Sequence, residues 1–106
     1  ALSSAASDVY KRQVYSLGNF CFGGNSSPSD MDTMIFQQTF TFEKGQKVED
    51  RNARIIPCMV SSVSTRNDFK PTPAVGEDAE RILQRMNEYS RDFGVEIDEN
   101  GGIIVN

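Results

Sequence analysis

The chain has 106 residues, a formal net charge of −4 at pH 7 and no histidine. Its acidic balance, without a basic run or stripe, argues against nucleic acid and anionic membrane as partners. No apolar stretch approaches the ~20 residues that span a bilayer, and the lack of histidine removes the commonest metal ligand and general base.

The first residues differ in character from all that follow. Residues 3–13 match, residue for residue, the translation of one reading frame of a common transposon-tagging sequencing adapter. We therefore predict that residues 1–13 are a non-native, adapter-derived segment, comparable to a fusion scar. The natural polypeptide is then expected to start at Val14, in the middle of a domain.

The remaining residues, 14–106, are enough for at most one small domain. Without Asp8, Lys11 and Arg12 they carry nine basic and fourteen acidic side chains, a formal charge of −5. The acidic balance is therefore a property of the predicted native part.

The segment from Val14 to Phe22 is apolar and aromatic, with Gly18 at its centre. It predicts a buried strand with a kink or a close backbone approach at the glycine. Because an unpaired buried amide costs on the order of 1–3 kcal/mol, Asn19 needs a partner in such a strand. It is either a ligand contact or a residue that shapes a bulge, and the spacing alone favours the bulge. The turn residues at 23–30 predict a surface loop.

Two further strands are expected in the middle of the chain. Residues 34–42 alternate with period two, which predicts a half-buried strand with its phenylalanines pointing inward. Residues 43–46 predict a turn, and residues 54–60 predict the hairpin partner. Pro57 cannot donate to a ladder, so we expect this second strand at a sheet edge or bulged at the proline.

The last third predicts a connector, a helix and a hairpin. Residues 65–75 are expected to be extended, and apolar side chains at helical spacing predict an amphipathic helix over 77–93. Its apolar face is either core or a surface for a missing partner. Gly94 suits a left-handed cap, and residues 95–98 and 101–105 predict a small hairpin. The order indicates an α+β fragment of antiparallel strands with one C-terminal amphipathic helix.

Few residues suggest chemistry. Cys21 and Cys58 lie in apolar runs, where a buried free thiol is favoured over a bridge between them. Asp30 and Asp32 resemble the start of a calcium loop, but the ligand pattern then fails, so turn-forming and capping roles are favoured. The polar run 66–70 is either a solvated loop or part of a pocket rim. The residues alone predict no catalytic residue, metal ligand or cofactor.

One motif resembles a known family. Residues 15–20, with the sequence YSLGNF, are followed by Gly23-Gly24, and this resembles a hallmark of the bacterial capsule-synthesis CapA family. That family is associated with poly-γ-glutamate production and has a metallophosphatase-like (calcineurin-like) fold, in which the strand follows a Gly-x-His-Pro-His type motif. The resemblance implies that residues 14–94 are the C-terminal part of a larger calcineurin-like α/β/β/α sandwich and that 95–106 are a tail.

The resemblance also implies a function. The intact parent would be a hydrolase or transferase that depends on divalent metal ions, associated with the membrane at the extracytoplasmic face of the bacterial envelope. The family's metal-ligand residues match no position here, so the fragment itself is expected to be inactive. Ser16, Gly18 and Asn19 carry over as residues at the edge of a substrate-binding site. The implied partners are the missing N-terminal part of the domain, poly-γ-glutamate and capsule-synthesis membrane proteins.

Two other interpretations stay open. The parent could be a non-catalytic scaffold of the cell envelope that binds an anionic polymer without cutting it, and eroded upstream metal motifs would favour this alternative. A stand-alone β-rich interaction domain starting at Val14 is least favoured, because an exposed strand there would leave Tyr15, Leu17 and Phe20 without partners.

Overall fold

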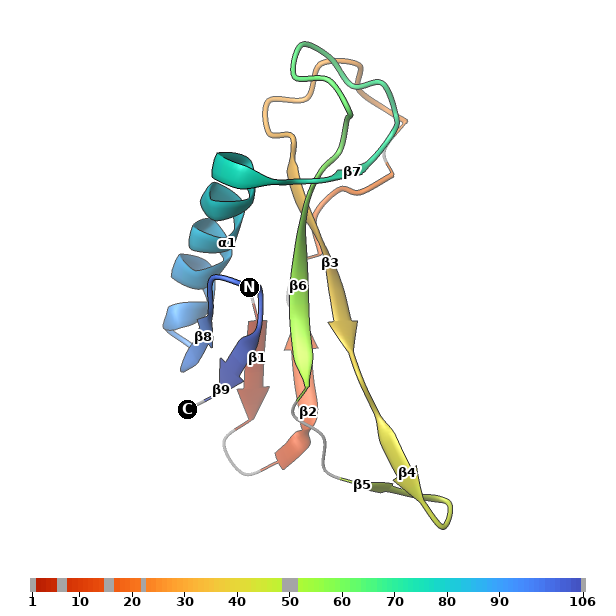
Figure 1. Ribbon diagram of the computed structural model, residues 1–106, viewed down its shortest axis with the longest axis vertical. Coiled ribbons are helices and arrows are strands. Elements are labelled where there is room, and N and C mark those ends of the chain that lie inside the picture. The colour runs from red at the N-terminus through yellow and green to blue at the C-terminus, as the bar shows by residue number, and fades with distance from the viewer. Residues whose placement is uncertain (1, 6–7, 15–16, 22, 49–51, 106) are drawn as a thin grey trace.

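The computed structural model describes residues 2–5, 8–14, 17–21, 23–48 and 52–105. Within these ranges, all strands pair antiparallel and one helix lies towards the C-terminus (Figure 1). The α+β class with antiparallel strands and a single helix is thereby confirmed. No helix in the described part of the chain is long and apolar enough to cross a membrane.

The elements, in chain order, are β1 (Leu2–Ala5), β2 (Asp8–Val14), β3 (Asp32–Gln38), β4 (Thr41–Glu43), β5 (Gln46–Val48), β6 (Ala53–Met59), β7 (Thr72–Pro73), α1 (Gly76–Arg91), β8 (Val95–Ile97) and β9 (Ile103–Val105).

The central sheet has the order β3-β6-β7. β6 pairs with β3 along its whole length, from Ala53 opposite Gln38 to Met59 opposite Asp32, so the predicted hairpin partner is confirmed. The expectation that Pro57 marks an edge or a bulge is wrong, because β6 is the middle strand and its register with β3 is continuous.

The pairing geometry explains why this proline is tolerated. The amide of Ala74 donates to the carbonyl of Pro57 over 2.9 Å. In an antiparallel strand the N–H and C=O of one residue point to the same neighbour. The missing N–H of Pro57 therefore faces the short strand β7, and the ladder with β3 loses no hydrogen bond.

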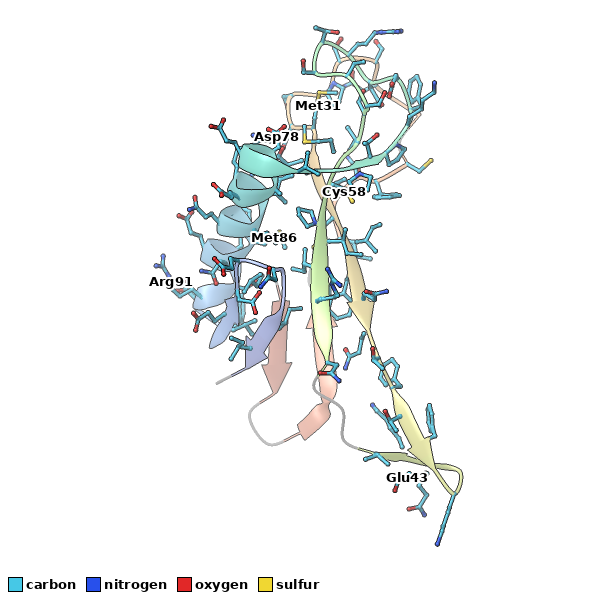
Figure 2. All side chains as sticks on the ribbon, in the orientation of Figure 1. Met31, Glu43, Cys58, Asp78, Met86 and Arg91 are labelled. Carbon is cyan, nitrogen blue, oxygen red and sulfur yellow. The ribbon has the colours of Figure 1, made fainter. Side chains whose placement is uncertain are left out.

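Helix α1 covers one face of this sheet, as the prediction of an amphipathic helix requires. The buried core joins the sheet, the helix and the tail hairpin, and its members are Met34, Ile55, Leu83, Val95 and Ile97. Figure 2 shows Met86 on the sheet-facing side of the helix and Arg91 pointing away. Tyr89 and Phe93, which lie at helical spacing with the apolar residues Ile82 and Met86, are exposed. Gly94 has φ +72°, which confirms the left-handed cap.

The predicted C-terminal hairpin is confirmed as β8 and β9. Its turn is organised by Asp98, whose Oδ1 accepts the amides of Asn100 and Gly102, both at 2.8 Å. The Ile55 amide donates to the carbonyl of Gly101 over 2.8 Å, which joins the hairpin to β6. Gly101 has φ +82°, and a Cβ there would lie 2.0 Å from the Ile55 carbonyl oxygen, so the turn needs glycine.

The β4–β5 hairpin projects away from α1 at the far end of the molecule (Figure 1). Its two-residue turn places Lys44 and Gly45 at φ 50° and 78°, the left-handed pair that suits the twist of a hairpin. Phe40 and Phe42 are 51% and 65% exposed. The prediction that they point into the core is wrong, because the strand breaks after Gln38 and no described element covers β4.

The segment after β2 differs from its prediction. Leu17–Cys21 forms no strand, and Leu17 and Phe20 are 60% and 38% exposed. Tyr15, Ser16 and Phe22 lie outside the described residues. Cys21 is exposed and Cys58 buried, both as free thiols. Core packing is therefore confirmed for Cys58 alone, and the alternative of a bridge is wrong. The predicted loop at 23–30 is confirmed where it is described.

Residues 2–5 and 8–14 form the hairpin β1–β2. β1 lies against α1 and β8, and Val14 at the end of β2 packs against the core. The adapter origin of residues 1–13 and the boundary at Val14 stay predictions, because a foreign segment and a native one can both pair as a hairpin.

Candidate functional site

A cavity of about 260 Å³ lies between helix α1, the start of β3 and the segment after β2. Its walls combine apolar side chains from the helix and the strand with a charged group at one side. The lining residues are Leu17, Gly18, Asp30, Asp32, Thr33, Met34, Ile82, Arg85, Met86 and Tyr89. It is the place where residues distant in sequence meet around charged groups, and we take it as the candidate site.

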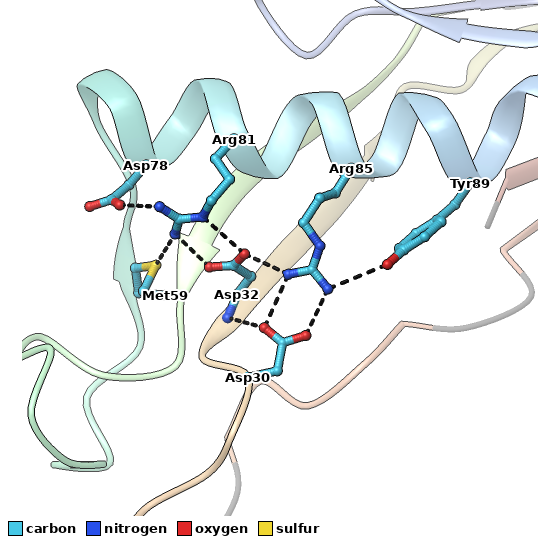
Figure 3. A network of polar contacts seen from close by, with 7 residues as sticks. All are labelled: Asp30, Asp32, Met59, Asp78, Arg81, Arg85 and Tyr89. Atoms are coloured by element: carbon cyan, nitrogen blue, oxygen red, sulfur yellow. Dashed lines mark hydrogen bonds and ion pairs between the residues drawn. The ribbon is translucent and has the colours of Figure 1, made fainter.

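Asp32 is the centre of the charged group (Figure 3). Its Oδ1 accepts Arg81 Nη2 at 2.7 Å and its Oδ2 accepts Arg81 Nε at 3.3 Å. The same Oδ2 accepts Arg85 Nη1 at 2.6 Å. The Asp32 side chain is only 12% exposed, so one shielded carboxylate holds two guanidinium groups from the helix.

The outer members of the group repeat this pairing nearer to solvent. Arg85 also holds Asp30 with two hydrogen bonds, Nη1 to Oδ1 at 3.1 Å and Nη2 to Oδ2 at 2.8 Å. Tyr89 lies against Arg85, with its hydroxyl 3.5 Å from Nη2. Arg81 is bonded to Asp78 at 2.5 Å, one helical turn before it. We call Asp30, Asp32, Asp78, Arg81 and Arg85 the Arg–Asp cluster.

Local geometry brings this cluster together. Residues 81 and 85 are four apart on one helix and therefore share a face. Asp30 precedes β3, and its Oδ1 accepts the Asp32 amide at 3.0 Å, which fixes the turn into the strand. This hydrogen bond confirms the turn-forming role favoured for Asp30. Both carboxylates then point at the helix, with Asp32 on the strand face that α1 covers.

The electrostatics of the Arg–Asp cluster are those of mutual neutralisation. Hydrogen bonds from Arg81 and Arg85 hold the pKa of Asp32 below its ordinary value, and those from Arg85 do the same for Asp30. The carboxylates raise the pKa of both arginines. None of these four groups exchanges a proton near neutral pH. The arrangement therefore fixes the helix to the strand and offers no general acid or base.

The sequence-predicted site residues are only partly brought together. Gly18, with φ +70°, lines the cavity beside Leu17. Asn19 is exposed and is absent from the cavity lining. Ser16 lies outside the described residues. The proposal of a substrate-site edge at these three positions stays a prediction.

A second polar group ties two loops together at the end of the molecule beyond β7. Asp68 accepts the Ser61 hydroxyl at 2.9 Å and the Ser62 amide at 3.0 Å, and it also accepts the Ser62 hydroxyl. These hydrogen bonds hold the pKa of the Asp68 carboxyl well below its usual range. Buried Asn67 bonds to the loop at 23–31. Its backbone N–H donates to the Ser26 carbonyl, and its side-chain Nδ2 donates to the Asn25 carbonyl. The polar run 66–70 therefore connects the two loops, and it does not line the cavity.

Sequence reasoning singled out Asp30 and Asp32 but missed Arg81 and Arg85. The available signal was a pair of arginines four apart beside the apolar stripe of the helix, matched in number by two aspartates two apart. Neither spacing alone shows that the two pairs meet, because Arg85 and Asp32 are separated by 53 residues.

No group of three or more histidine, cysteine, aspartate or glutamate side chains that could hold a metal ion occurs among the residues described. No known protein family, curated protein or solved structure matches the chain.

Proposed function

We propose that this chain is the C-terminal part of a CapA-like, metallophosphatase-fold protein of the bacterial cell envelope. The parent is a metal-dependent hydrolase or transferase of poly-γ-glutamate capsule synthesis. This part supplies framework strands, a covering helix and an edge of the substrate pocket, and the catalytic groups come from elsewhere in the parent. The proposal rests on the YSLGNF motif with its glycine loop and on one structural observation.

That observation concerns the two faces of the β3-β6-β7 sheet: α1 covers one face, and the opposite face carries an apolar pair that is not fully covered. Residues Met34 and Ile55 face α1 and are buried. On the opposite face, Ile35 pairs directly with Ile56, and Ile35 is 39% exposed. In an α/β/β/α sandwich a second sheet covers this second face. A helix on one face and an uncovered apolar pair on the other is what one outer half of such a sandwich would present.

The charges around the cavity do not suit a metal ion. Asp30 and Asp32 are the carboxylates of the cavity wall, and both are engaged by arginine guanidinium groups. A divalent cation would have to displace Arg85 from between them and Arg81 from Asp32. We therefore assign the parent's metal ions to residues outside this chain and derive no reaction step from them.

The same pairing disfavours the scaffold alternative for this part of the parent. A carboxylate polymer such as poly-γ-glutamate needs accessible cations. Arg85 at the cavity and Arg81 one helical turn before it already have carboxylate partners within the fold, and the chain carries a net charge of −4. A polymer carboxylate would only exchange one anionic partner for another.

The decisive test is a long sequencing read of the source DNA across the codon for Val14. We expect native codons to continue upstream into a Gly-x-His-Pro-His type motif and earlier aspartates, replacing the codons of residues 1–13. A start codon directly before Val14 would overturn the proposal and leave a small binding domain.

A biochemical test uses the purified chain. Isothermal titration with Mn²⁺ is expected to show no binding at micromolar concentration, and p-nitrophenyl phosphate is expected not to be hydrolysed above the buffer rate. The matched control is an Asp30→Asn, Asp32→Asn double variant, which removes both carboxylates of the cavity wall. Micromolar Mn²⁺ binding that this variant loses would contradict the proposal that the metal ligands lie elsewhere.

A further inference from the structure

We propose that residues 17–21 close onto the open edge of β3 as an additional antiparallel strand, and that the side chain of Leu17 then fills the cavity beside the Arg–Asp cluster. This inference does not depend on the proposed function, because it rests on the edge, the cavity and the adjoining segment alone.

The outer edge of β3 has no paired strand among the described residues. β3 is the outer strand of the sheet β3-β6-β7. On β6, the backbone groups of Ile55 and Pro57 point away from β3, since they bond with Gly101 and Ala74. Because the direction of the backbone N–H and C=O groups alternates along a strand, those groups of Arg54, Ile56 and Cys58 point towards β3.

The partners of those three β6 residues on β3 are Gln37, Ile35 and Thr33. The backbone N–H and C=O groups of Met34 and Phe36 consequently point to the outer edge. Met34 is 6% exposed and Phe36 is half-buried. Among the residues that the structure describes, no strand pairs with this edge, and such an edge at buried residues is a template for a further strand.

The second step is the identity of the occupant. Leu17 and Gly18 already line the cavity together with Met34 of β3. The connection from this segment to β3 is the turn-rich loop at 23–31, and a connection that short returns the chain antiparallel. A tethered segment competes at a high effective concentration against any free peptide.

The third step is the fit of the side chains. Leu17 is 60% exposed as it stands, while the cavity next to it is walled by Met34, Ile82 and Met86. Moving Leu17 into this space removes apolar surface from water without disturbing a charge. Gly18 has φ +70° and nothing within 4 Å of its Cβ position. A glycine in this conformation is the residue that a β-bulge uses, so a paired strand can keep it.

The test is amide hydrogen exchange and NOE spectroscopy by NMR on the full chain. We expect the amides of Met34 and Phe36 to exchange at least about tenfold more slowly than unpaired amides, with cross-strand NOEs to residues 17–21. Exchange at the unpaired rate would overturn the proposal. Protection that depends on protein concentration, without intrachain NOEs, would also overturn it and indicate a second copy at this edge.

A pair of matched variants separates closure from general stability. Leu17→Asp is expected to abolish the protection of the Met34 and Phe36 amides and to lower Tm. Val63→Asp changes another exposed apolar residue, 40% exposed in a loop away from the cavity, and is expected to leave that protection intact. The Ile55 amide, bonded to Gly101, reports that each variant is folded. Retained protection in folded Leu17→Asp would contradict the proposal.

Discussion

The alternating residues 34–42 fall into two parts that differ in burial. Met34 and Phe36 belong to β3 and pack against the core beneath α1. Phe40 and Phe42, in the same period-two pattern, flank or lie on β4 and are more than half exposed. The pattern fixes which side chains share a face, but burial depends on whether another element covers that face. A strand pattern therefore predicts local structure more safely than it predicts a core.

The part of the sheet beside α1 (the near region) and the β4–β5 hairpin (the far region) also differ in the contacts that stabilise them. Near α1, the sheet gains the core, the Arg–Asp cluster and the tail hairpin. The far hairpin has its own strand pairing and Lys47 placed 4.7 Å from the centre of the Phe40 ring. An isolated two-stranded hairpin is marginal in water. The far region should therefore tolerate substitutions that the near region does not.

The largest expected effect is in the core. Ile55→Ala removes a side chain that is 0% exposed and leaves a cavity among Leu83, Val95 and Ile97, so it should lower the free energy of unfolding by about 4 kcal/mol. Phe42→Ala, at 65% exposure, should change it by less than about 0.5 kcal/mol. Urea titrations followed by circular dichroism measure both. Equal losses would mean that the far hairpin is part of the cooperative core.

Next in size is a comparison of two turns. Gly101→Ala would place a Cβ 2.0 Å from the Ile55 carbonyl, at φ +82°, so it should cost about 3 kcal/mol. Gly45→Ala has a similar φ of +78° but nothing within 4 Å, and should cost about 1 kcal/mol. The same urea titration measures the difference, which isolates the steric clash from the backbone conformation. Equal costs would show that the tail hairpin shifts freely away from β6.

What could be predicted from the sequence follows the same division. The helix, the β3–β6 hairpin and the tail hairpin were predicted correctly because each depends on local periodicity and on turn or cap residues such as Gly94. The exposure of Phe40 and Phe42 and the place of Pro57 in a middle strand were not, because they depend on which strand or layer lies opposite.

The candidate site was least accessible to sequence reasoning. The segment at Leu17–Cys21 has the composition of a strand, but the structure does not show it paired as one. The contacts of the Arg–Asp cluster that link α1 to Asp30 and Asp32 join residues 49 to 55 positions apart, and no local spacing encodes such a contact. Family resemblance placed Gly18 at the edge of a substrate site; Gly18 lines the cavity, and its contact with substrate stays a prediction.

Within the Arg–Asp cluster, we expect a moderate loss of stability from a change at the shielded Asp32 and a smaller loss from a change at the exposed Asp78. Asp32→Asn removes the charge that holds both Arg81 and Arg85, at a side chain 12% exposed, and should cost about 1–2 kcal/mol. Asp78→Asn alters a pair whose side chains are 46% and 56% exposed, and should cost less than about 0.5 kcal/mol. Thermal unfolding in low salt and in 1 M salt checks this. A larger loss from Asp78→Asn would place the main attachment at the helix N-terminus.

The smallest and most specific effect is on the pH dependence. The folded pKa values of Asp30 and Asp32 lie below their ordinary value because of the arginines, and that of Asp68 lies below it because of Ser62 and Ser61. A lowered folded pKa gives stability that is present above the unfolded value of about 3.9 and is lost as pH falls through the folded one. The free energy of unfolding should therefore decrease from pH 5 to pH 2.

The Asp32→Asn variant makes this pH prediction specific to the near region. Its deficit relative to the unmodified chain should be full at pH 6 and should shrink as the pH falls through the lowered folded pKa of Asp32, where Asp32 itself becomes protonated. Asp68→Asn should instead reduce the loss of stability at low pH, because it removes the carboxylate that binds Ser61 and Ser62. It should leave the ionic contacts of Arg81 and Arg85 intact. Urea titrations at pH 6, 4, 3 and 2 measure both deficits. A deficit of Asp32→Asn that stays constant with pH would mean that its cause is lost packing and not lost charge.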